Sequence, residues 1–320
     1  YVLKRSGGSY RQFLFSFYDQ NQKEWSLVPD LSVSSVVKFI QNKINTKTKW
    51  FYTGEAYRKQ NKNYNSPIIN QTGFEIFASN DKIKDDKEII QTSIEIFKKS
   101  KFKKGELNIS NIEIFNALID RLSLALRWKE RIKRHFCREA YFNQLLRKLS
   151  SDTDINFAEV EKDKKIAEKF RKQKPSTLYS GRALKDILER FDLKNFKEPR
   201  SIADKKSVKI IKNYLKISCS IDNAPSTLNK FFKKNKLNLF ISDDYFPVVK
   251  TINRKIKINF SSNINRSLEY YSGMVFNITV NKKGKKFSLI SGGRYDGLLK
   301  NLGSKKNTTA VGAAIDMSLL

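Results

Sequence analysis

The residues that most often carry nucleophilic or metal chemistry are scarce in this chain of 320 residues. Its two cysteines, Cys137 and Cys219, stand far apart with no second cysteine nearby, which argues against a disulfide framework or a cysteine-rich zinc site. The single histidine, His135, rules out a two-histidine metal site within one chain. No Gly-x-Ser-x-Gly elbow accompanies it for a serine–histidine–aspartate triad. We therefore expect an ordinary, partly buried or surface histidine and no metal.

Phosphate chemistry and the net charge point to no enzyme class either. The sequence has neither a Walker loop nor Gly-x-Gly-x-x-Gly, so P-loop and Rossmann chemistry are not expected. Its 63 Lys and Arg face 32 Asp and Glu, which gives a net charge of +31. A protein with this much positive charge attracts polyanions. The basic residues are mostly scattered lysines without an arginine-rich arm or an RNA-recognition motif, so we expect nucleic-acid binding not to be the main function.

The chain shows no signal for a membrane or for secretion. No apolar run approaches the roughly 20 residues that span a bilayer, and no signal-peptide pattern opens the chain. We expect a cytoplasmic protein that does not contact membranes. The first residues, from Tyr1 to Arg5, read like the interior of a longer protein, so we also expect an N-terminal segment to precede them.

Strand and helix patterns alternate in the first third and return to strand at the end. Short strand patterns around the polar turn at 19–22 predict a hairpin. Apolar residues at helical spacing predict a helix over 31–44. The further expected elements are strands over 50–57, 68–77, 106–109, 268–280, 286–290 and 309–315, and helices over 88–99, 111–121 and 296–301.

The middle of the chain has a different character. From Arg127 to Arg171 apolar residues recur every three or four positions among charged ones, which indicates helices with solvated faces. Strands early, helices in the middle and strands late favour an α+β fold, in which an antiparallel sheet flanked by helices is divided by a helical insertion. We expect the core in two parts, 1–125 and 223–320, and the insertion over 126–222.

Five segments resemble the signatures of one family, in the family's order. They are Val-Pro-Asp-Leu-Ser at 28–32, Thr-Gly-Glu-Ala-Tyr-Arg at 53–58, Gln-Thr-Gly-Phe-Glu-Ile-Phe at 71–77, Arg-Ser-Leu-Glu-Tyr-Tyr-Ser-Gly-Met-Val-Phe at 266–276 and Gly-Gly-Arg-Tyr-Asp-Gly-Leu at 292–298. The sequence is thereby similar to histidyl-tRNA synthetases and to the regulatory subunits of ATP phosphoribosyltransferase that share their fold. The first segment is closer to the regulatory subunits, and the last matches the family without a substitution. The resemblance implies a class II synthetase-like sheet over most of 1–120 and 220–320.

The resemblance also implies a histidine-binding pocket. Its implied residues are Asp30, Ser32, Gln71, Glu75, Arg266, Tyr271 and Tyr295. A zwitterion needs an acceptor for its ammonium, the implied role of Asp30 and Gln71, and a donor for its carboxylate, the implied role of Arg266. An imidazole needs polar partners, the implied role of Glu75 and Tyr271, while Tyr295 closes the wall.

Four positions in these segments carry a structural expectation. Tyr270 and Tyr271 should point to opposite faces of a strand, so we expect at least one of them to serve in packing. We expect Gly54 and Gly73 to be strand or bend residues and not ligand contacts.

The family's ATP-binding residues are largely replaced. Val28 occupies the position of the arginine in the family's first loop, and Leu319 that of the arginine in the third signature. Gln60 occupies the position of the acidic residue that shortly follows the arginine of the second signature. Of these ATP-binding residues, Arg58 alone is kept. A phosphate clamp works as a preorganised set of charges, so we interpret Arg58 as a vestige of the ATP side. We expect no catalytic residues, no cofactor and no adenylation activity. Because the chain ends at Leu320, we also expect no anticodon-binding domain.

The residues implied to bind histidine are kept, whereas most of those implied to bind ATP are replaced. This combination favours a regulatory role. The resemblance then implies a non-catalytic regulatory subunit of ATP phosphoribosyltransferase in histidine biosynthesis. Its implied partners are the short-form catalytic subunit, a second copy of the chain in a dimer within a hetero-oligomer, and L-histidine as effector. Two alternatives stay open: a fragment of a histidyl-tRNA synthetase, and another synthetase paralogue with an RNA-linked role.

Overall fold

The computed structural model describes residues 13–59, 66–150, 165–173, 178–179, 182–185, 187–189, 205–242, 246, 256–264, 270–282 and 284–320. The chain divides into two compact units. The first combines Tyr1–Ala117 with Tyr214–Leu320, and the second is Leu118–Asn213. The domain borders expected after residues 125 and 222 stay a prediction.

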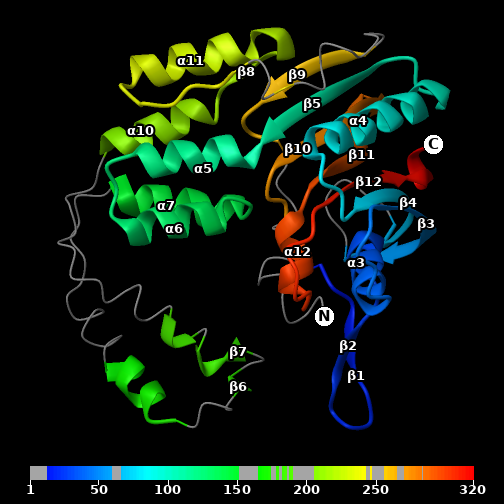
Figure 1. The fold of residues 1–320 in the computed structure, drawn as a ribbon, viewed down its shortest axis with the longest axis horizontal. Coiled ribbons are helices and arrows are strands. Elements are labelled where there is room, and N and C mark those ends of the chain that lie inside the picture. The colour runs from blue at the N-terminus through cyan, green and yellow to red at the C-terminus, as the bar shows by residue number, and fades with distance from the viewer. Residues whose placement is uncertain are drawn as a thin grey trace. The chain divides into compact units, whose positions relative to one another are not determined.

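An eight-stranded sheet forms the centre of the first unit (Figure 1). Its strand order is β3-β4-β12-β11-β10-β5-β9-β8. The strands are β3 (Thr48–Tyr57), β4 (Ile68–Phe77), β5 (Gly105–Asn111), β8 (Ser218–Ser220), β9 (Lys257–Ser261), β10 (Met274–Lys282), β11 (Lys285–Arg294) and β12 (Ala310–Asp316). The α+β class is confirmed, with one correction to the antiparallel sheet: β5 and β9 run parallel. The chain returns to β9 through helices, and such a crossover permits a parallel pair where a hairpin does not.

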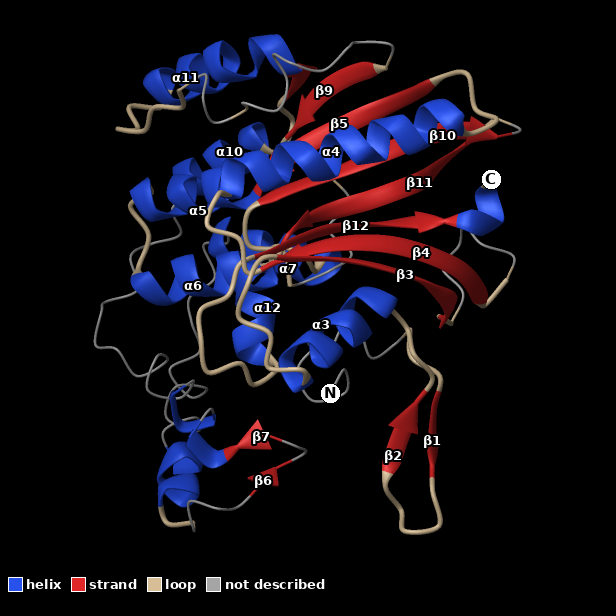
Figure 2. Cartoon of the chain, turned by 45° about the vertical axis from the view of Figure 1, so that its right-hand side comes forward, coloured by secondary structure: helices blue, strands red, loops and turns tan. Residues whose placement is uncertain are grey.

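The two faces of this sheet differ in chemistry. Helix α4 (Lys82–Lys99) lies across one face (Figure 2), where Arg294 of β11 donates to Asp86 of the helix. Because side chains alternate across a strand, the neighbouring Gly293 faces the other side. Gly312 of β12 stands directly opposite Gly293, and Glu75 of β4 stands directly opposite Gly312. Both therefore lie on the same side as Gly293. One face is therefore covered by α4, and the other carries the glycines and the buried Glu75.

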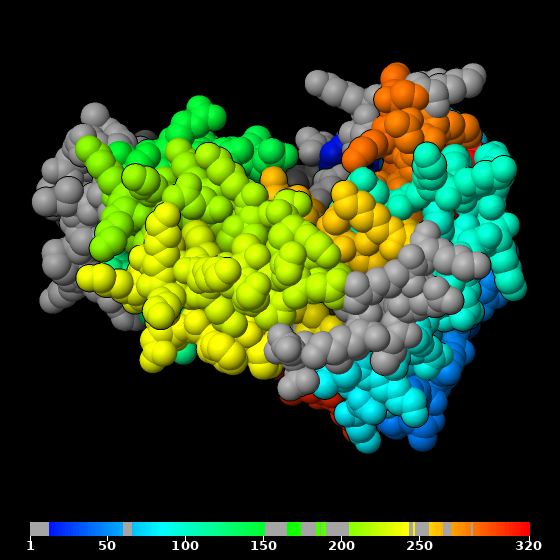
Figure 3. Space-filling view, turned by 90° about the horizontal axis from the view of Figure 1, so that it is seen from above, coloured from blue at the N-terminus to red at the C-terminus, as the bar shows by residue number. Residues whose placement is uncertain are grey.

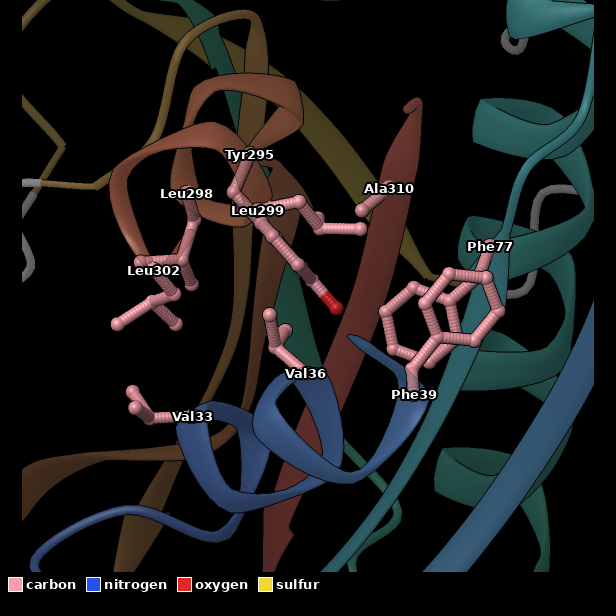
Figure 4. Close-up of a cluster of buried hydrophobic side chains, with 9 residues drawn as sticks. All are labelled: Val33, Val36, Phe39, Phe77, Tyr295, Leu298, Leu299, Leu302 and Ala310. Carbon is pink, nitrogen blue, oxygen red and sulfur yellow. The ribbon is translucent and has the colours of Figure 1, made fainter. Parts of the chain in front are cut away.

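Helix α3 (Leu31–Gln41) begins at Asp30, whose side chain accepts a hydrogen bond from Ser32 N. Its apolar stripe packs on the end of the sheet and on α12 (Asp296–Asn301). The shared core consists of Val33, Val36, Phe39, Phe77, Tyr295, Leu298, Leu299, Leu302 and Ala310 (Figure 4). The Tyr295 side chain crosses this core with its hydroxyl directed toward α3. The Tyr295 ring thus packs on α3, while its hydroxyl donates to Glu75 of β4.

The predicted hairpin at the start of the chain is confirmed by β1 (Ser16–Tyr18) and β2 (Glu24–Ser26), which pair antiparallel. Asp19 organises its turn by accepting hydrogen bonds from Asn21 N and Lys23 N, both at 2.9 Å. Trp25 Nε1 also donates to Asp19, at 2.7 Å.

Strand β8 forms one edge of the eight-stranded sheet. Helix α11 (Ala224–Lys234), yellow in Figure 3, lies against it.

The helical character predicted for the middle of the chain is present in the described part of the second unit. Helix α5 (Ile112–Arg121) leads into it, and its further elements are α6 (Leu126–His135), α7 (Glu139–Ser150), the short pair β6 (Leu178–Tyr179) and β7 (Arg182–Ala183), and α10 (Lys205–Tyr214). Edge-on packing of Phe136 against Phe142 joins α6 to α7. His135 ends α6 half-buried, with its ring edge-on to Tyr141. Over the described ranges, the structure contains no helix of the length and apolarity needed to cross a membrane.

Several predicted boundaries shift. Helix α3 ends at Gln41 and not at Ile44, and α4 begins at Lys82, where Asp81 supplies its cap. The strand expected over 268–280 begins only at Met274. Residues 265–269 lie outside the described residues, and Tyr270 precedes the strand as part of a turn. Local strand preference of the tyrosines is overridden there, because both rings pack on the core of α3 and α12.

Candidate functional site

Glu75 is the centre of the candidate site. It lies on β4 with 1% of its surface exposed. Its Oε1 accepts a hydrogen bond from Tyr52 Oη at 2.8 Å, and its Oε2 accepts one from Tyr295 Oη. Burial raises the pKa of the Glu75 carboxyl to about 7, although the tyrosine hydrogen bonds lower it. Tyr52 Oη also lies 2.7 Å from Ser32 Oγ, and because its one proton goes to Glu75, Ser32 is the donor.

Two glycines make room for these side chains. Gly312 stands opposite Glu75 in the β4–β12 ladder, and a Cβ at that position would lie 1.3 Å from Glu75 Oε2. Gly73 stands opposite Tyr52 in the β3–β4 ladder, and a Cβ there would lie 2.2 Å from Tyr52 Oη. The glycines therefore allow the carboxylate and the phenol to lie flat on the sheet. The expectation that Gly73 is a strand residue is confirmed.

Asp30 forms the second anionic group of the site, and it is 2% exposed. Its Oδ1 accepts from Ser32 N at 2.9 Å and from Gln71 Nε2 at 3.2 Å. Its Oδ2 accepts from Tyr270 Oη at 3.2 Å. Gln71 Oε1 in turn accepts from Leu31 N at 3.2 Å. The side chains of Asp30 and Gln71 thus bond one another and the start of α3.

Three tyrosines close the site around Glu75 and Asp30. The ring centroids of Tyr270 and Tyr271 lie 5.0 Å apart, and that of Tyr270 lies 5.7 Å from the Tyr295 ring. Burial raises the pKa of the Tyr271 hydroxyl, and the nearby carboxylates of Asp30 and Glu75 raise it further. The expectation that Tyr270 and Tyr271 lie on opposite faces of a strand is wrong. Both precede β10, and both pack against the core of α3 and α12.

Arg58 lies closer to this group than the sequence suggests. Its Nε donates to Pro29 O at 2.7 Å, and its Nη2 lies 3.7 Å from Asp30 Oδ2. The guanidinium expected as a vestige of the ATP side therefore holds the loop that positions Asp30. Arg266, the implied carboxylate donor, lies outside the described residues, as does Gln60.

The positions at which the resemblance implies charged ATP-binding residues carry uncharged side chains here. Leu319, at the position of the family's arginine, is buried. Ser318 Oγ, at the position of the family's glutamate, accepts from Asn70 N at 3.3 Å. Val28 is an exposed apolar side chain. These positions carry no charge for a polyphosphate.

Asp316, the last residue of β12, lies on the same face of the sheet as Glu75 but outside its hydrogen-bonded group. It stands opposite Gln71 in the β4–β12 ladder, so its side chain lies on the face of Glu75. Its Oδ1 accepts from Ser318 N at 3.0 Å. Its Oδ2 is buried and has no hydrogen-bond partner among the described residues. Burial raises the pKa of this carboxyl.

The segment at 292–298 divides its polar residues between the two faces. Arg294 is 3% exposed and lies on the α4 side, where it donates to Asp86, to Asp296 and to Lys82 O. Asp296 Oδ1 also accepts from Ala310 N at 2.8 Å. Burial raises the pKa of Asp86 to about 6, against the lowering effect of Arg294. Arg294 and Asp296 therefore tie α4 to the sheet, and Tyr295 alone reaches the site.

The structure brings all predicted site residues within the described part of the chain into one polar cluster. We define this polar cluster as Asp30, Ser32, Tyr52, Gln71, Glu75, Tyr270, Tyr271 and Tyr295. Sequence reasoning missed Tyr52 and Tyr270. A signal for Tyr52 exists, because an aromatic residue and a glycine in facing strands indicate a ring lying across the glycine. Arg266 stays a prediction.

Comparison with known proteins decides the family. The family model for histidyl-tRNA synthetase matches residues 1–320. The chain belongs to the histidyl-tRNA synthetase family. The ATP phosphoribosyltransferase regulatory subunit of Sinorhizobium fredii is 22% identical, and the match covers 98% of this chain and 86% of that protein. The histidine–tRNA ligase of Prochlorococcus marinus is 25% identical over 96% of this chain but only 57% of that protein.

Solved structures of the family have the same fold. A protein described as an ATP phosphoribosyltransferase regulatory subunit/histidyl-tRNA synthetase from Bacillus halodurans matches 96% of this chain and 67% of its own, with a TM-score of 0.58 and 16% identity. Histidyl-tRNA synthetase from Nostoc matches 99% of this chain and 63% of its own, with a TM-score of 0.58 and 15% identity. The class II synthetase-like fold predicted from the motifs is confirmed.

Proposed function

We propose that this chain is a regulatory, non-catalytic subunit of ATP phosphoribosyltransferase, the enzyme that opens histidine biosynthesis. In this role it activates the short-form catalytic subunit and binds L-histidine as a feedback effector. It forms a dimer within the hetero-oligomer. The observation that supports the proposal is a contrast within this sheet: both oxygens of the buried Glu75 accept tyrosine hydroxyls, whereas the implied ATP side holds the uncharged Leu319 and Ser318.

The name of the Sinorhizobium relative supports this proposal, because that regulatory subunit matches nearly its whole length here. Loss of adenylation follows from electrostatics. Stabilising a phosphoryl transition state requires preorganised positive charge, and the positions of Val28 and Leu319 supply none.

Activation of the catalytic subunit is the direct test. The full-length protein is mixed with a short-form ATP phosphoribosyltransferase at micromolar concentration, and transfer of phosphoribosyl to ATP is measured with and without L-histidine. We expect a higher rate with the chain present and inhibition by histidine. An unchanged rate with both proteins folded contradicts the proposal. Robust histidine-dependent ATP–pyrophosphate exchange by the chain alone would identify a synthetase instead.

Arg266 provides a residue-level test of histidine binding. Removing the charged partner of the ligand carboxylate in Arg266→Ala should weaken binding by about 2–5 kcal/mol, the range for truncating one partner of a buried charge pair. Exposed Arg147 on α7 provides a matched control, and Arg147→Ala should bind histidine like the wild type in titration calorimetry. Equal affinity of all three proteins would place the effector elsewhere.

One observation favours a second function, a synthetase paralogue with an RNA-linked role. The net charge of +31 attracts polyanions. Capture of partners from the native extract separates the two functions. A short phosphoribosyltransferase among the partners supports the regulatory subunit, whereas tRNA as the partner supports the alternative.

A further inference from the structure

Helix α4 ends in a run of lysines that differs from the basic residues around its first half. Near the start of the helix, Lys82 pairs with Asp296 at 3.0 Å and Lys47 pairs with Asp85 at 2.6 Å. The seven residues at 98–104 then carry five lysines: Lys98, Lys99, Lys101, Lys103 and Lys104. All five are exposed, and none forms an ion pair with another described residue. The end of α4 thus presents positive charge that the described protein does not neutralise.

The sheet brings further lysines to this end of the helix. The register of β5 on β10 places the α4–β5 loop beside the turn between β10 and β11 (Figure 2). Lys282 at the end of β10 stands opposite Lys285 at the start of β11, and Lys257 begins β9 next to the start of β5. We define the lysine patch as Lys98, Lys99, Lys101, Lys103, Lys104, Lys257, Lys282, Lys285 and Lys286. Segments far apart in the sequence therefore meet there, which the scattered lysines of the sequence did not indicate.

Few acidic side chains offset the charge of the lysine patch. Glu106 pairs with Lys286 at 3.2 Å. Glu95 precedes the run by one turn of α4, and Asp316 lies within reach of the charge of Lys282. Among the described residues, nine lysines thus face three carboxylates, and this excess gives the surface a positive potential.

Two ordinary causes of exposed lysines do not account for the lysine patch. The dipole of α4 favours cations in its last turn, and this explains Lys98 and Lys99 only. A lysine-rich chain carries basic residues everywhere, but Lys and Arg fill 63 of 320 positions in the whole sequence. At 98–104 lysine fills five of seven. The concentration of lysine after the helix therefore needs another explanation.

The α4–β5 loop that carries the last three lysines of the run is held by local contacts. Ser100 Oγ donates to Phe97 O at 2.7 Å and accepts from Phe102 N at 3.2 Å. Gly105 ends the loop against the Phe97 ring, since a Cβ at Gly105 would lie 2.7 Å from that ring. The backbone of the loop is therefore ordered before a partner binds, which lowers the entropic cost of binding.

The composition of the lysine patch selects among anionic partners. Protein interfaces are depleted in lysine and enriched in aromatic residues, and helices that bind anionic membranes also insert apolar side chains. None of the exposed large apolar side chains in the described part of the chain lies at 98–104, 257 or 282–286. The phosphates of a nucleic acid, by contrast, are bound by lysines acting as point charges.

We propose that the lysine patch binds the phosphate backbone of a nucleic acid without reading its bases. The lysine patch crosses the neighbouring strands β11, β10, β5 and β9, about 14 Å at ~4.8 Å per strand. A duplex carries about eight phosphate charges over that length of its axis. RNA and DNA share this backbone chemistry. The proposal uses no residue of the polar cluster around Glu75, so it stands or falls apart from the proposed function.

Fluorescence anisotropy of the full-length protein tests the lysine patch with three labelled probes. They are a short RNA duplex, a DNA duplex of the same length and a polyglutamate peptide. The patch variant combines Lys99→Gln, Lys101→Gln and Lys103→Gln. The matched control combines Lys230→Gln, Lys233→Gln and Lys234→Gln, three exposed lysines of α11. Both variants lose the same charge, so only its position differs.

We expect the wild type and the control to bind both duplexes alike, with an affinity that falls steeply as salt rises. The patch variant should bind at least about tenfold more weakly at low salt. Its slope of log affinity against log salt should be smaller by about three, because each lysine that contacts a phosphate contributes about one. Tighter binding of one duplex than of the other would identify RNA or DNA as the source of the phosphates.

Three results would overturn the proposal. Equal weakening in the two variants would show that polyanions are attracted by the total charge and not by the lysine patch. Tighter binding of polyglutamate than of either duplex would identify an acidic protein as the partner. Absence of binding to both duplexes at micromolar concentration would show that the lysine patch binds no nucleic acid.

Discussion

The two ends of β12 differ in how their polar groups are satisfied. At Gly312 the strand approaches Glu75 so closely that no Cβ fits, and two tyrosines complete the carboxylate's hydrogen bonds. At Asp316 the carboxyl group has one buried oxygen without a partner in the described structure, and Leu319 beyond it is apolar. The Gly312 end is tightly packed and its facing carboxylate is hydrogen-bonded, whereas the Asp316 end leaves a buried carboxyl oxygen without a partner among the described residues. The comparison shows that one strand can combine a fully hydrogen-bonded carboxylate with one that is only half engaged.

The largest effect should come from Gly312→Ala. The added Cβ would lie 1.3 Å from Glu75 Oε2 and 2.8 Å from Phe74 O, and the backbone oxygen cannot move aside. Overpacking of this kind costs about 3 kcal/mol of unfolding free energy, measured by urea denaturation. Gly297→Ala is the control, because a Cβ at that position meets nothing within 4 Å. Equal stability of both variants would contradict a tightly packed Gly312 end.

The pH dependence of stability should reveal Glu75. Its pKa is about 7 in the folded state because of burial, against 4.5 for an ordinary carboxyl. Between these values the folded state keeps a proton that the unfolded state has lost, so stability falls as pH rises from about 4.5 to 7 and levels off above. At ~1.4 kcal/mol per pKa unit over about 2.5 units, the drop is on the order of 3 kcal/mol. Urea midpoints across this range should show a smaller drop for Glu75→Gln than for the wild type, and identical profiles would contradict the assignment.

A smaller effect should come from single tyrosine hydroxyls. Tyr295→Phe removes the donor to Glu75 Oε2 and leaves a buried oxygen unsatisfied, which should cost about 1–2 kcal/mol. Tyr57 lies at the far end of β3, where its hydroxyl donates to the exposed Glu55. Tyr57→Phe should not change the thermal midpoint measurably. If the two variants lose the same stability, the buried hydrogen bond to Glu75 contributes no more than the exposed one to Glu55.

The sequence predicted those elements well whose signals lie within the element itself. The expected strand at 68–77 matches β4 in full. The first-third hairpin and α12 also match, since turn residues and apolar spacing are local signals. Family motifs placed Asp30, Glu75 and Tyr295 together, which periodicity alone could not have done.

The failures share a physical cause, which is the dependence on partners distant in sequence. Tyr270 and Tyr271 have strand propensity, but their packing on α3 ends the strand before it reaches them. Tyr52 belongs to the polar cluster because Gly73, which stands opposite it, leaves room for its ring. The sequence of one strand does not determine which residues of the partner strand stand opposite it. Local patterns therefore gave the elements, and the pairings that complete the site needed the structure.

The sheet order bears on the way the protein emerges from the ribosome. Strand β4 pairs with β12, although residues 78–309 are synthesised between them. At roughly 5–20 residues per second, translation leaves that edge of β4 unpaired for about 10–50 seconds. An unpaired strand edge is a template for wrong association. The β4 edge of the nascent chain is therefore open to wrong pairing until β12 has been made.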